Sequence, residues 1–273
     1  MKNIKIGLGQ LLIEGGEPDR NFNRAKDLIK DAKKNNCSLI LLPECLDFGW
    51  THPSGINNSK TIPGEFSNIL CDEAKKNEIY ICAGLTEKDN VKNKNYNSAI
   101  LIDKQGNILT KYRKINVLEQ AFEFYEVGNK LEVIDTEFGK IGINICSDNY
   151  HDSIDIGYVL CRMGAEIILS PSSWTVDYNV TEEMDPYKNK WIDQFLKISK
   201  IFEIPVISTT SVGYIVGGPY EGKKMVGCSI ATDKNGLLTK GDFNEFASDL
   251  KIVDVEIKNN GIKGTQIGKE IYK

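Results

Sequence analysis

The chain has 273 residues, of which 41% are hydrophobic, and this length and composition suffice for a sizeable core. Its formal net charge is −4 and no basic patch stands out, so the sequence carries no electrostatic signature of nucleic-acid binding. The seven cysteines are odd in number and scattered, which favours reduced thiols in a cytoplasmic protein over a disulfide framework. No apolar run approaches the ~20 residues that span a bilayer, so we expect no membrane segment.

Apolar residues recur along the chain with the spacing of strands and helices in alternation. In chain order the pattern predicts a strand at 3–12, a helix at 21–35, a strand at 37–42, a helix at 67–77, and strands at 80–85, 96–103, 108–112, 130–136 and 140–146. It then predicts a helix at 155–164, a strand at 166–170, a helix at 189–202, and strands at 205–210, 226–232 and 250–255.

The continuous apolar run at 37–42 is typical of a strand that is covered on both faces, as in a sheet flanked by helices. The strands at 96–103 and 108–112 are joined by a tight turn at Gly106, so the sheets are expected to be mixed rather than purely parallel. We therefore predict an α/β layered fold. No linker interrupts the chain, which predicts a single domain over 1–273 with a peripheral polar tail at 258–273.

Three polar residues stand at or just beyond the ends of predicted strands: Glu44, Lys114 and Cys146. Ligand sites in α/β sheets gather at the carboxyl ends of strands, so we expect these side chains to meet. A nearby ammonium stabilises a thiolate, and a carboxylate can take the thiol proton and return it to a leaving amine. A cysteine taken alone usually behaves as a small buried hydrophobe. It is the joint placement that predicts a nucleophile at Cys146.

These residues lie in segments that resemble the nitrilase, or carbon–nitrogen hydrolase, superfamily, and the resemblance runs from the first strand to about Val255. Residues 41–44 resemble the segment that carries the family's general-base glutamate. The other similar segments are the catalytic-lysine segment at 96–100 and 111–116, the nucleophile strand at 138–148, the pocket-lining segment at 164–174 and a Gly-x-Ser strand at 227–230. Five segments in the family's order make the resemblance specific.

The resemblance implies a four-layer α-β-β-α sandwich with two mixed sheets and a catalytic triad of Glu44, Lys114 and Cys146. It implies cleavage of a nonpeptide C–N bond in a small amide or N-carbamoyl compound through a cysteine thioester, with release of ammonia or an amine. Neither a metal nor an organic cofactor is expected, and the expected partners are a small-molecule substrate and further copies of the chain in a homodimer or larger homo-oligomer. The alternatives are a nitrilase acting on a nitrile and a catalytically silent relative that serves in binding or assembly.

Two positions between the lysine and the cysteine bear on this comparison. Asn116 stands two residues after the lysine, where the family often has histidine, and this difference affects how Lys114 is held. The family also often has a second glutamate in this region, and Glu119, Glu123 and Glu126 compete for that role. The family's spacing favours Glu123 as a fourth catalytic residue, with Glu119 second.

The residues that follow the nucleophile and those in the pocket-lining segment are expected to contact the substrate. The candidates are Glu119, Ser147, Asp148, Asn149, Ser172 and Trp174. His151 invites a Cys–His dyad, but a histidine this close in sequence to the thiol is more often a solvated loop residue. With two histidines and scattered cysteines, the sequence does not favour a metal site. The choice among amide, N-carbamoyl and nitrile substrates depends on loops that the sequence alone does not place.

Overall fold

The computed structural model describes residues 2–259, apart from the side chain of residue 189, and its strands form two six-stranded mixed sheets. In spatial order the first sheet contains β15 (Asp249–Ile257), β1 (Lys2–Gln10), β2 (Leu39–Leu41), β3 (Tyr80–Asp89), β4 (Lys94–Ile102) and β5 (Ile108–Arg113). The second contains β14 (Gly236–Lys240), β13 (Ile230–Asp233), β10 (Val206–Thr210), β8 (Ile167–Ser172), β7 (Gly139–Ile143) and β6 (Val133–Thr136). A three-stranded sheet joins β11 (Val212–Tyr214), β12 (Lys224–Val226) and β9 (Thr175–Val176).

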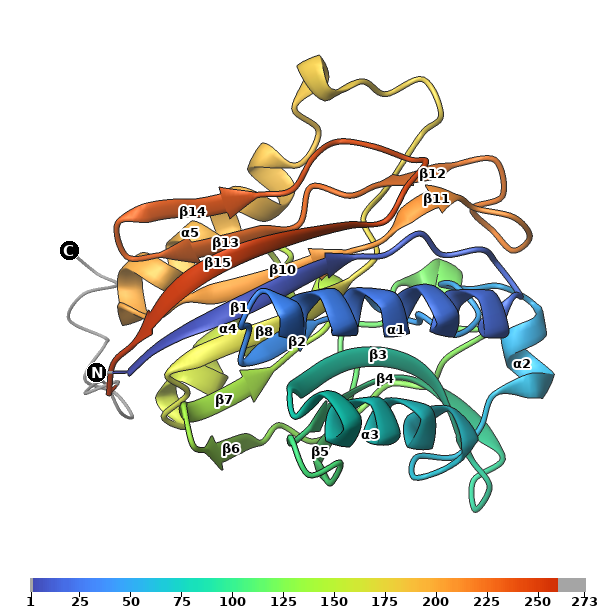
Figure 1. The fold of residues 1–273 in the computed structure, drawn as a ribbon. Helices are drawn as coiled ribbons and strands as arrows, with labels where there is room; N and C mark the ends of the chain where they lie inside the picture. The colour runs from blue at the N-terminus through green and yellow to red at the C-terminus, as the bar shows by residue number, and fades with distance from the viewer. Residues whose placement is uncertain (1, 260–273) are drawn as a thin grey trace.

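Helices cover the outer face of each sheet (Figure 1). α1 (Pro18–Lys34) and α3 (Glu65–Asn77) pack on the first sheet, and α4 (Asp155–Arg162) and α5 (Asp193–Phe202) pack on the second. The remaining helical segments are α2 (Ser54–Asn58), the 3-10 turns η1 (Glu119–Ala121), η2 (Cys146–Asn149) and η3 (Glu182–Met184), and the π-helical turn η4 (Lys188–Ile192). The predicted four-layer α-β-β-α sandwich is confirmed.

Strand β2 shows why a continuous apolar run is needed in the middle of this fold. Leu39 and Leu41 point into the core between the two sheets, whereas Ile40 and Leu42 pack in the second core beneath α1 and α3. β2 runs parallel to both of its neighbours, β1 and β3. A strand covered on both faces has no solvated side and therefore cannot alternate apolar with polar residues.

The predicted strand at 140–146 ends earlier than the sequence pattern indicates. β7 stops at Ile143, which lies opposite Leu169 of β8, and Cys146 begins the 3-10 turn η2. The apolar alternation continues to Ile145 because that side chain is still buried in the core between the sheets. The alternation of apolar residues at 140–146 therefore reflects the burial of their side chains and not the length of the paired strand.

The strand predicted at 166–170 continues through Pro171 to Ser172. Pro171 lies opposite Thr209 of β10, but β7 on the other side of β8 has already ended. The missing N–H of Pro171 therefore leaves no bond to β7 unmade, which is why proline is tolerated inside this strand.

Several other boundaries differ from the predicted ones. The helix predicted at 189–202 begins as the π-helical turn η4 and continues as α5, and the strand predicted at 226–232 is divided between β12 and β13. The short elements β9, β11, β14 and α2 were not predicted, because two to five residues are too few to show a period. The predicted tail at 258–273 lies, from residue 260 on, outside the described residues. Within residues 2–259 no helix combines the length and the apolar character needed to cross a bilayer.

Candidate active site

Glu44 lies just after β2 in a position that is fixed by both sheets. Its backbone N–H donates to the carbonyl oxygen of Ser172 in β8, at 3.2 Å. On the other side, a Cβ added at Gly84 of β3 would lie 2.5 Å from the Cα of Glu44, so the close approach of the two backbones requires glycine there. The Glu44 side chain is 1% exposed.

Lys114 follows β5 and reaches the same buried point. Its Nζ donates to Oε1 of Glu44 at 2.7 Å, and its side chain is 2% exposed. The backbone N–H of Lys114 donates to the carbonyl oxygen of Asn97 at 2.8 Å, while Nδ2 of Asn97 also donates to Oε1 of Glu44, at 2.5 Å. Two donors from neighbouring segments thus hold one carboxylate oxygen of Glu44.

Cys146 stands at the turn from β7 into η2 with a φ of 48°, in the left-handed region that a non-glycine residue rarely occupies. Strained backbone of this kind is found where a fold must present a side chain at a sharp turn, as in the nucleophile elbows of hydrolases. The residue is 5% exposed, and its Sγ lies 4.0 Å from the carbonyl oxygen of Ser173. The turn therefore presents the thiol just beyond β7, at the end of the second sheet.

Burial and neighbouring charges set the protonation of the pair. Burial raises the pKa of the Cys146 thiol to about 12; the Glu44 carboxylate raises it further and the Lys114 ammonium offsets part of the effect. Burial by itself lowers the pKa of Lys114, but the carboxylates of Glu44 and Asp148 outweigh it and hold the pKa above its usual value. The resting site thus contains a neutral thiol beside a charged ammonium. Attack by sulfur then requires a base.

Cys146 and Lys114 line a cavity of about 140 Å³. Its walls combine four aromatic side chains with three lysines; besides Cys146 and Lys114 the lining residues are Trp50, Leu118, Tyr150, Ser173, Thr175, Lys190, Trp191, Tyr220 and Lys223. Most of these were missed by the sequence interpretation. They come from loops and turns far apart in the chain, and no local pattern signals their convergence. His151 is exposed and is not one of the lining residues.

The candidates that follow Cys146 form the rest of the turn η2 and do not line the cavity. Ser147, Asp148 and Asn149 are fully buried. The hydroxyl of Ser147 donates to the carbonyl oxygen of Asn116 at 2.7 Å, and Nδ2 of Asn149 donates to the carbonyl oxygen of Cys146 at 3.2 Å. These residues hold the shape of the turn; as substrate contacts they are not supported by their positions.

Ser172 and Trp174 are likewise buried and absent from the cavity wall. Trp174 stacks on Trp191 with ring centroids 4.8 Å apart and an interplanar angle of 10°, so it supports a wall residue from behind. The carbonyl oxygen of Ser172 accepts the hydrogen bond from the backbone N–H of Glu44. Of this segment, Ser173 is the residue that reaches the cavity together with Thr175.

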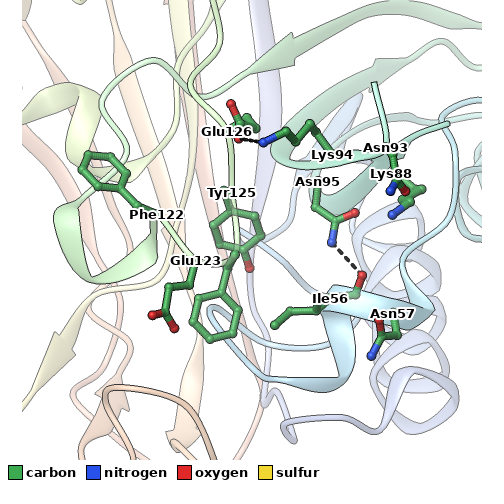
Figure 2. A pocket seen from close by; sticks show the side chains of 11 residues that line it. Ile56, Asn57, Lys88, Asn93, Lys94, Asn95, Phe122, Glu123, Tyr125 and Glu126 are labelled. Atoms are coloured by element: carbon green, nitrogen blue, oxygen red, sulfur yellow. Dashed lines mark hydrogen bonds and ion pairs between the residues drawn. The ribbon is translucent and has the colours of Figure 1, made fainter. Parts of the chain in front are cut away.

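The two glutamates expected near the lysine are not buried with it. Glu119 and Glu123 are both exposed and neither lines the cavity of Cys146. Figure 2 shows Glu123 in the wall of a separate pocket of about 350 Å³. The second carboxylate whose charge acts on Lys114 is Asp148, which also accepts a hydrogen bond from the N–H of Asn116 at 2.8 Å.

Asp148 connects the segment of the lysine with the turn of the cysteine. Its Oδ2 accepts hydrogen bonds from the Tyr112 hydroxyl at 2.7 Å and from the N–H of Ile145 at 2.8 Å. Asp148, which the sequence predicts as a substrate contact, thus ties β5 and the residues after it to the turn η2 in the structure. Within residues 2–259, no group of three or more His, Cys, Asp or Glu side chains is placed to hold a metal ion.

Comparison with known proteins gives consistent results. The family model described as carbon-nitrogen hydrolase matches residues 5–261. The chain is 33% identical over 180 residues to a nitrilase of Pyrococcus abyssi, covering 64% of this chain and 67% of that one. It is 27% identical over 185 residues to the omega-amidase NIT2-A of Xenopus laevis, covering 64% and 66%. The matched part thus spans about two thirds of each relative's length.

A solved structure of a double mutant of the amidase from Nesterenkonia sp. AN1, in complex with acrylamide, superposes with a TM-score of 0.77 at 16% identity. The match covers 93% of this chain and 91% of that one. At this identity the likeness concerns the fold. The resemblance noted in the sequence is confirmed by the family model, which extends over nearly the whole chain. The chain belongs to the carbon-nitrogen hydrolase family.

Proposed function

We propose that the protein hydrolyses the C–N bond of a small amide or N-carbamoyl compound, with Cys146 as nucleophile, Glu44 as general base and acid, and Lys114 as the group that stabilises negative charge. One observation carries this proposal. A carboxylate, an ammonium and a thiol from the ends of three different strands converge on one buried point beside a cavity, with Lys114 Nζ 2.7 Å from Glu44. Buried ionisable groups with shifted pKa values that gather beside a cavity are typical of catalytic sites.

In the proposed first half-reaction, Sγ of Cys146 attacks the carbonyl carbon while the Glu44 carboxylate takes the thiol proton. The tetrahedral oxyanion is stabilised by the Lys114 ammonium and by the backbone N–H beside Cys146. Collapse of this intermediate breaks the C–N bond, and Glu44 delivers its proton to the departing ammonia or amine. A thioester of Cys146 remains.

The second half-reaction removes the acyl group. Glu44 takes a proton from a water molecule, the resulting hydroxide attacks the thioester carbonyl, and the proton returns to sulfur as the thiolate leaves. The cycle begins and ends with a neutral thiol. Glu44 can therefore carry the proton in both half-reactions, and no second base is needed. Lys114 keeps its charge throughout, in agreement with a pKa held above the usual value.

The relatives support an amide substrate and leave a nitrile as the second candidate. An omega-amidase and a nitrilase are both similar in sequence to this chain, and the structurally similar amidase was solved with acrylamide, which is itself an amide. An alternative role as a silent binding module would leave the buried Glu44–Lys114 pair without a use. A cytoplasmic location and assembly into a homodimer or larger homo-oligomer stay predictions from the sequence and the resemblance.

A screen for ammonia release tests the proposal. Purified protein is incubated with three panels: ω-amides, N-carbamoyl compounds and aliphatic nitriles. Release from the first or second panel by the wild type, and its loss in Cys146→Ala, is the expected result. Turnover confined to nitriles would select the nitrilase alternative, and no turnover in any panel would favour the silent module.

A further inference from the structure

Trp50 lines the active-site cavity from a segment whose backbone has an unusual conformation. Within this segment Cys45, Gly49 and Thr51 have positive φ angles of 48°, 82° and 58°. Residues other than glycine occupy the left-handed region rarely and at a cost in conformational energy. Such a conformation persists where surrounding contacts over-determine it, so the position of Trp50 depends on what anchors residues 45–51.

The first anchor is Asp47, which is fully buried. Its Oδ2 accepts a hydrogen bond from the backbone N–H of Thr86 in β3 at 2.8 Å. Its Oδ1 accepts hydrogen bonds from the hydroxyl of Thr86 at 3.2 Å and from the N–H of Phe48 at 2.9 Å. One carboxylate therefore joins the segment of Trp50 to the first sheet.

The second anchor is the hydroxyl of Tyr125, a buried residue of the chain that follows η1. This hydroxyl accepts a hydrogen bond from the N–H of Thr51 at 3.2 Å and lies 3.5 Å from Sγ of Cys45. Tyr125, Cys45 and Trp50 belong to one apolar cluster. The ring of Trp50 also contacts Tyr220, another wall residue, with centroids 5.0 Å apart. Trp50 is thus held between two anchors that come from different parts of the chain.

The catalytic base does not depend on these anchors. Glu44 directly precedes the segment, but it is fixed by the carbonyl oxygen of Ser172 and by donors on Lys114 and Asn97. Loss of an anchor is therefore expected to displace Trp50 and to leave Glu44 in place. The cavity volume of about 140 Å³ is below the ~300–1,000 Å³ of pockets for drug-sized ligands, so its walls restrict the size of a ligand.

We propose that Asp47 and Tyr125 are positioning residues that hold Trp50 in the cavity wall and thereby set an upper limit on the size of the acyl group that reaches Cys146. This inference rests on the proposed function as far as the ligand is an acyl group. Removal of either anchor lets Trp50 withdraw, so larger ligands gain access while the smallest ones react as before. A merely structural role of the two residues predicts instead an equal loss of activity for ligands of every size.

The kinetic test compares acetamide with hexanamide, which have the same scissile bond and differ in chain length. Tyr125→Phe and Asp47→Asn are each expected to raise the ratio of kcat/KM for hexanamide to that for acetamide about fivefold, as for loss of one hydrogen bond. The kcat for acetamide should stay near that of the wild type. Tyr125→Phe keeps the aromatic ring, so it carries the test if Asp47→Asn does not fold.

Two further variants show whether the anchors act through Trp50. Trp50→Ala should itself raise the ratio, and addition of Tyr125→Phe to it should give no further rise, because the anchor then has nothing to hold. Tyr158→Phe is the matched control, since Tyr158 is a buried tyrosine of α4 that does not line the cavity. It should leave the ratio unchanged.

Alkylation separates this inference from the proposed function, because it requires the thiol and no turnover. The rates at which iodoacetamide and N-hexyl iodoacetamide modify Cys146 are measured by mass spectrometry, and both anchor variants are expected to raise the relative rate of the longer reagent. This result in a protein that releases ammonia from no substrate would overturn the proposed function and leave the size limit standing. A relative rate that Trp50→Ala raises and neither anchor variant changes, or an equal fall in both rates, would overturn the role of the anchors while hydrolysis stands.

Discussion

Replacement of Glu44 by glutamine separates the role of the carboxylate as a base from the effect of its charge on the pKa of Cys146. Glutamine keeps an oxygen that can accept the hydrogen bonds that Lys114 and Asn97 now donate to Oε1. It removes the negative charge and the ability to carry a proton. The variant is therefore expected to fold, to lose hydrolysis and yet to hold a more acidic thiol at Cys146.

The size of the expected change in alkylation rate follows from the pKa of the Cys146 thiol. The rise in the pKa of Cys146 from an ordinary 9.0 to about 12 corresponds to about 4 kcal/mol against forming the thiolate. Burial is the largest cause and the Glu44 charge the second, while Lys114 acts in the opposite direction. Without the carboxylate, Lys114 faces the thiol alone. Each unit by which the pKa falls raises the thiolate fraction tenfold near neutral pH, so we expect alkylation of Cys146 to accelerate about tenfold or more.

The assay is alkylation by iodoacetamide at pH 8, followed on the peptide that contains Cys146 by mass spectrometry, beside ammonia release by the same preparation. Hydrolysis is expected to fall about 10³-fold, within the range for loss of a general base. Glu123→Gln is the matched control. Glu123 follows the segment of Lys114 in the sequence but lies in a separate pocket (Figure 2). It should leave both rates near those of the wild type, and a loss of hydrolysis there would restore the second-glutamate hypothesis.

Two results would refute the reasoning about Glu44. If alkylation slows in parallel with hydrolysis, the carboxylate supports the reactive thiol and does not oppose its ionisation. If Glu44→Gln retains hydrolysis within about tenfold, the carboxylate is not the base, since that contribution is typically about 10²-fold or larger.

Three further predictions concern Cys146, Asn97 and, outside the cavity, Glu87 of β3, which forms ion pairs with Lys111 and Arg113. Cys146→Ala should abolish ammonia release with little change in thermal stability, and near-normal release would remove the nucleophile assignment. Asn97→Ala withdraws a donor from Glu44, so kcat should fall about tenfold to 100-fold with little change in KM; a change confined to KM would contradict a positioning role. Burial tends to raise the pKa of Glu87, but bonds from Arg113 and neighbouring donors outweigh it and hold the pKa below its usual range. Its contribution to stability is therefore present at neutral pH and lost as the pH falls through the lowered pKa. Glu87→Gln should cost about 3 kcal/mol in urea unfolding at pH 7 and less near pH 4, whereas an equal cost at both would exclude this linkage.

The positions of the three central residues could be predicted because each stands at a boundary that local sequence marks. Glu44 follows a continuous apolar run and a proline, and Cys146 follows the alternation of Ile141, Ile143 and Ile145. Strand ends collect at one edge of a sheet, so residues that end strands are brought together by the architecture itself. The layers of the fold were also predictable, because the spacing of apolar residues shows which faces of the strands and helices are buried.

The second carboxylate and the substrate wall were not predictable in this way. Family-like spacing pointed to Glu123, whereas the fold turns that residue toward solvent and brings Asp148 close enough for its charge to act on Lys114. Likewise Trp174 has the better position in the sequence, but Trp191 covers it and forms the wall. Spacing along the chain does not determine which side of a loop faces inward.

The sequence by itself thus determined the chemistry that this protein can carry, through residue types at strand ends and a family's order of segments. The tertiary structure alone decided the cavity and its charge, because the lining residues come from segments that lie far apart in the chain. Only the packing of the two sheets brings them around one thiol.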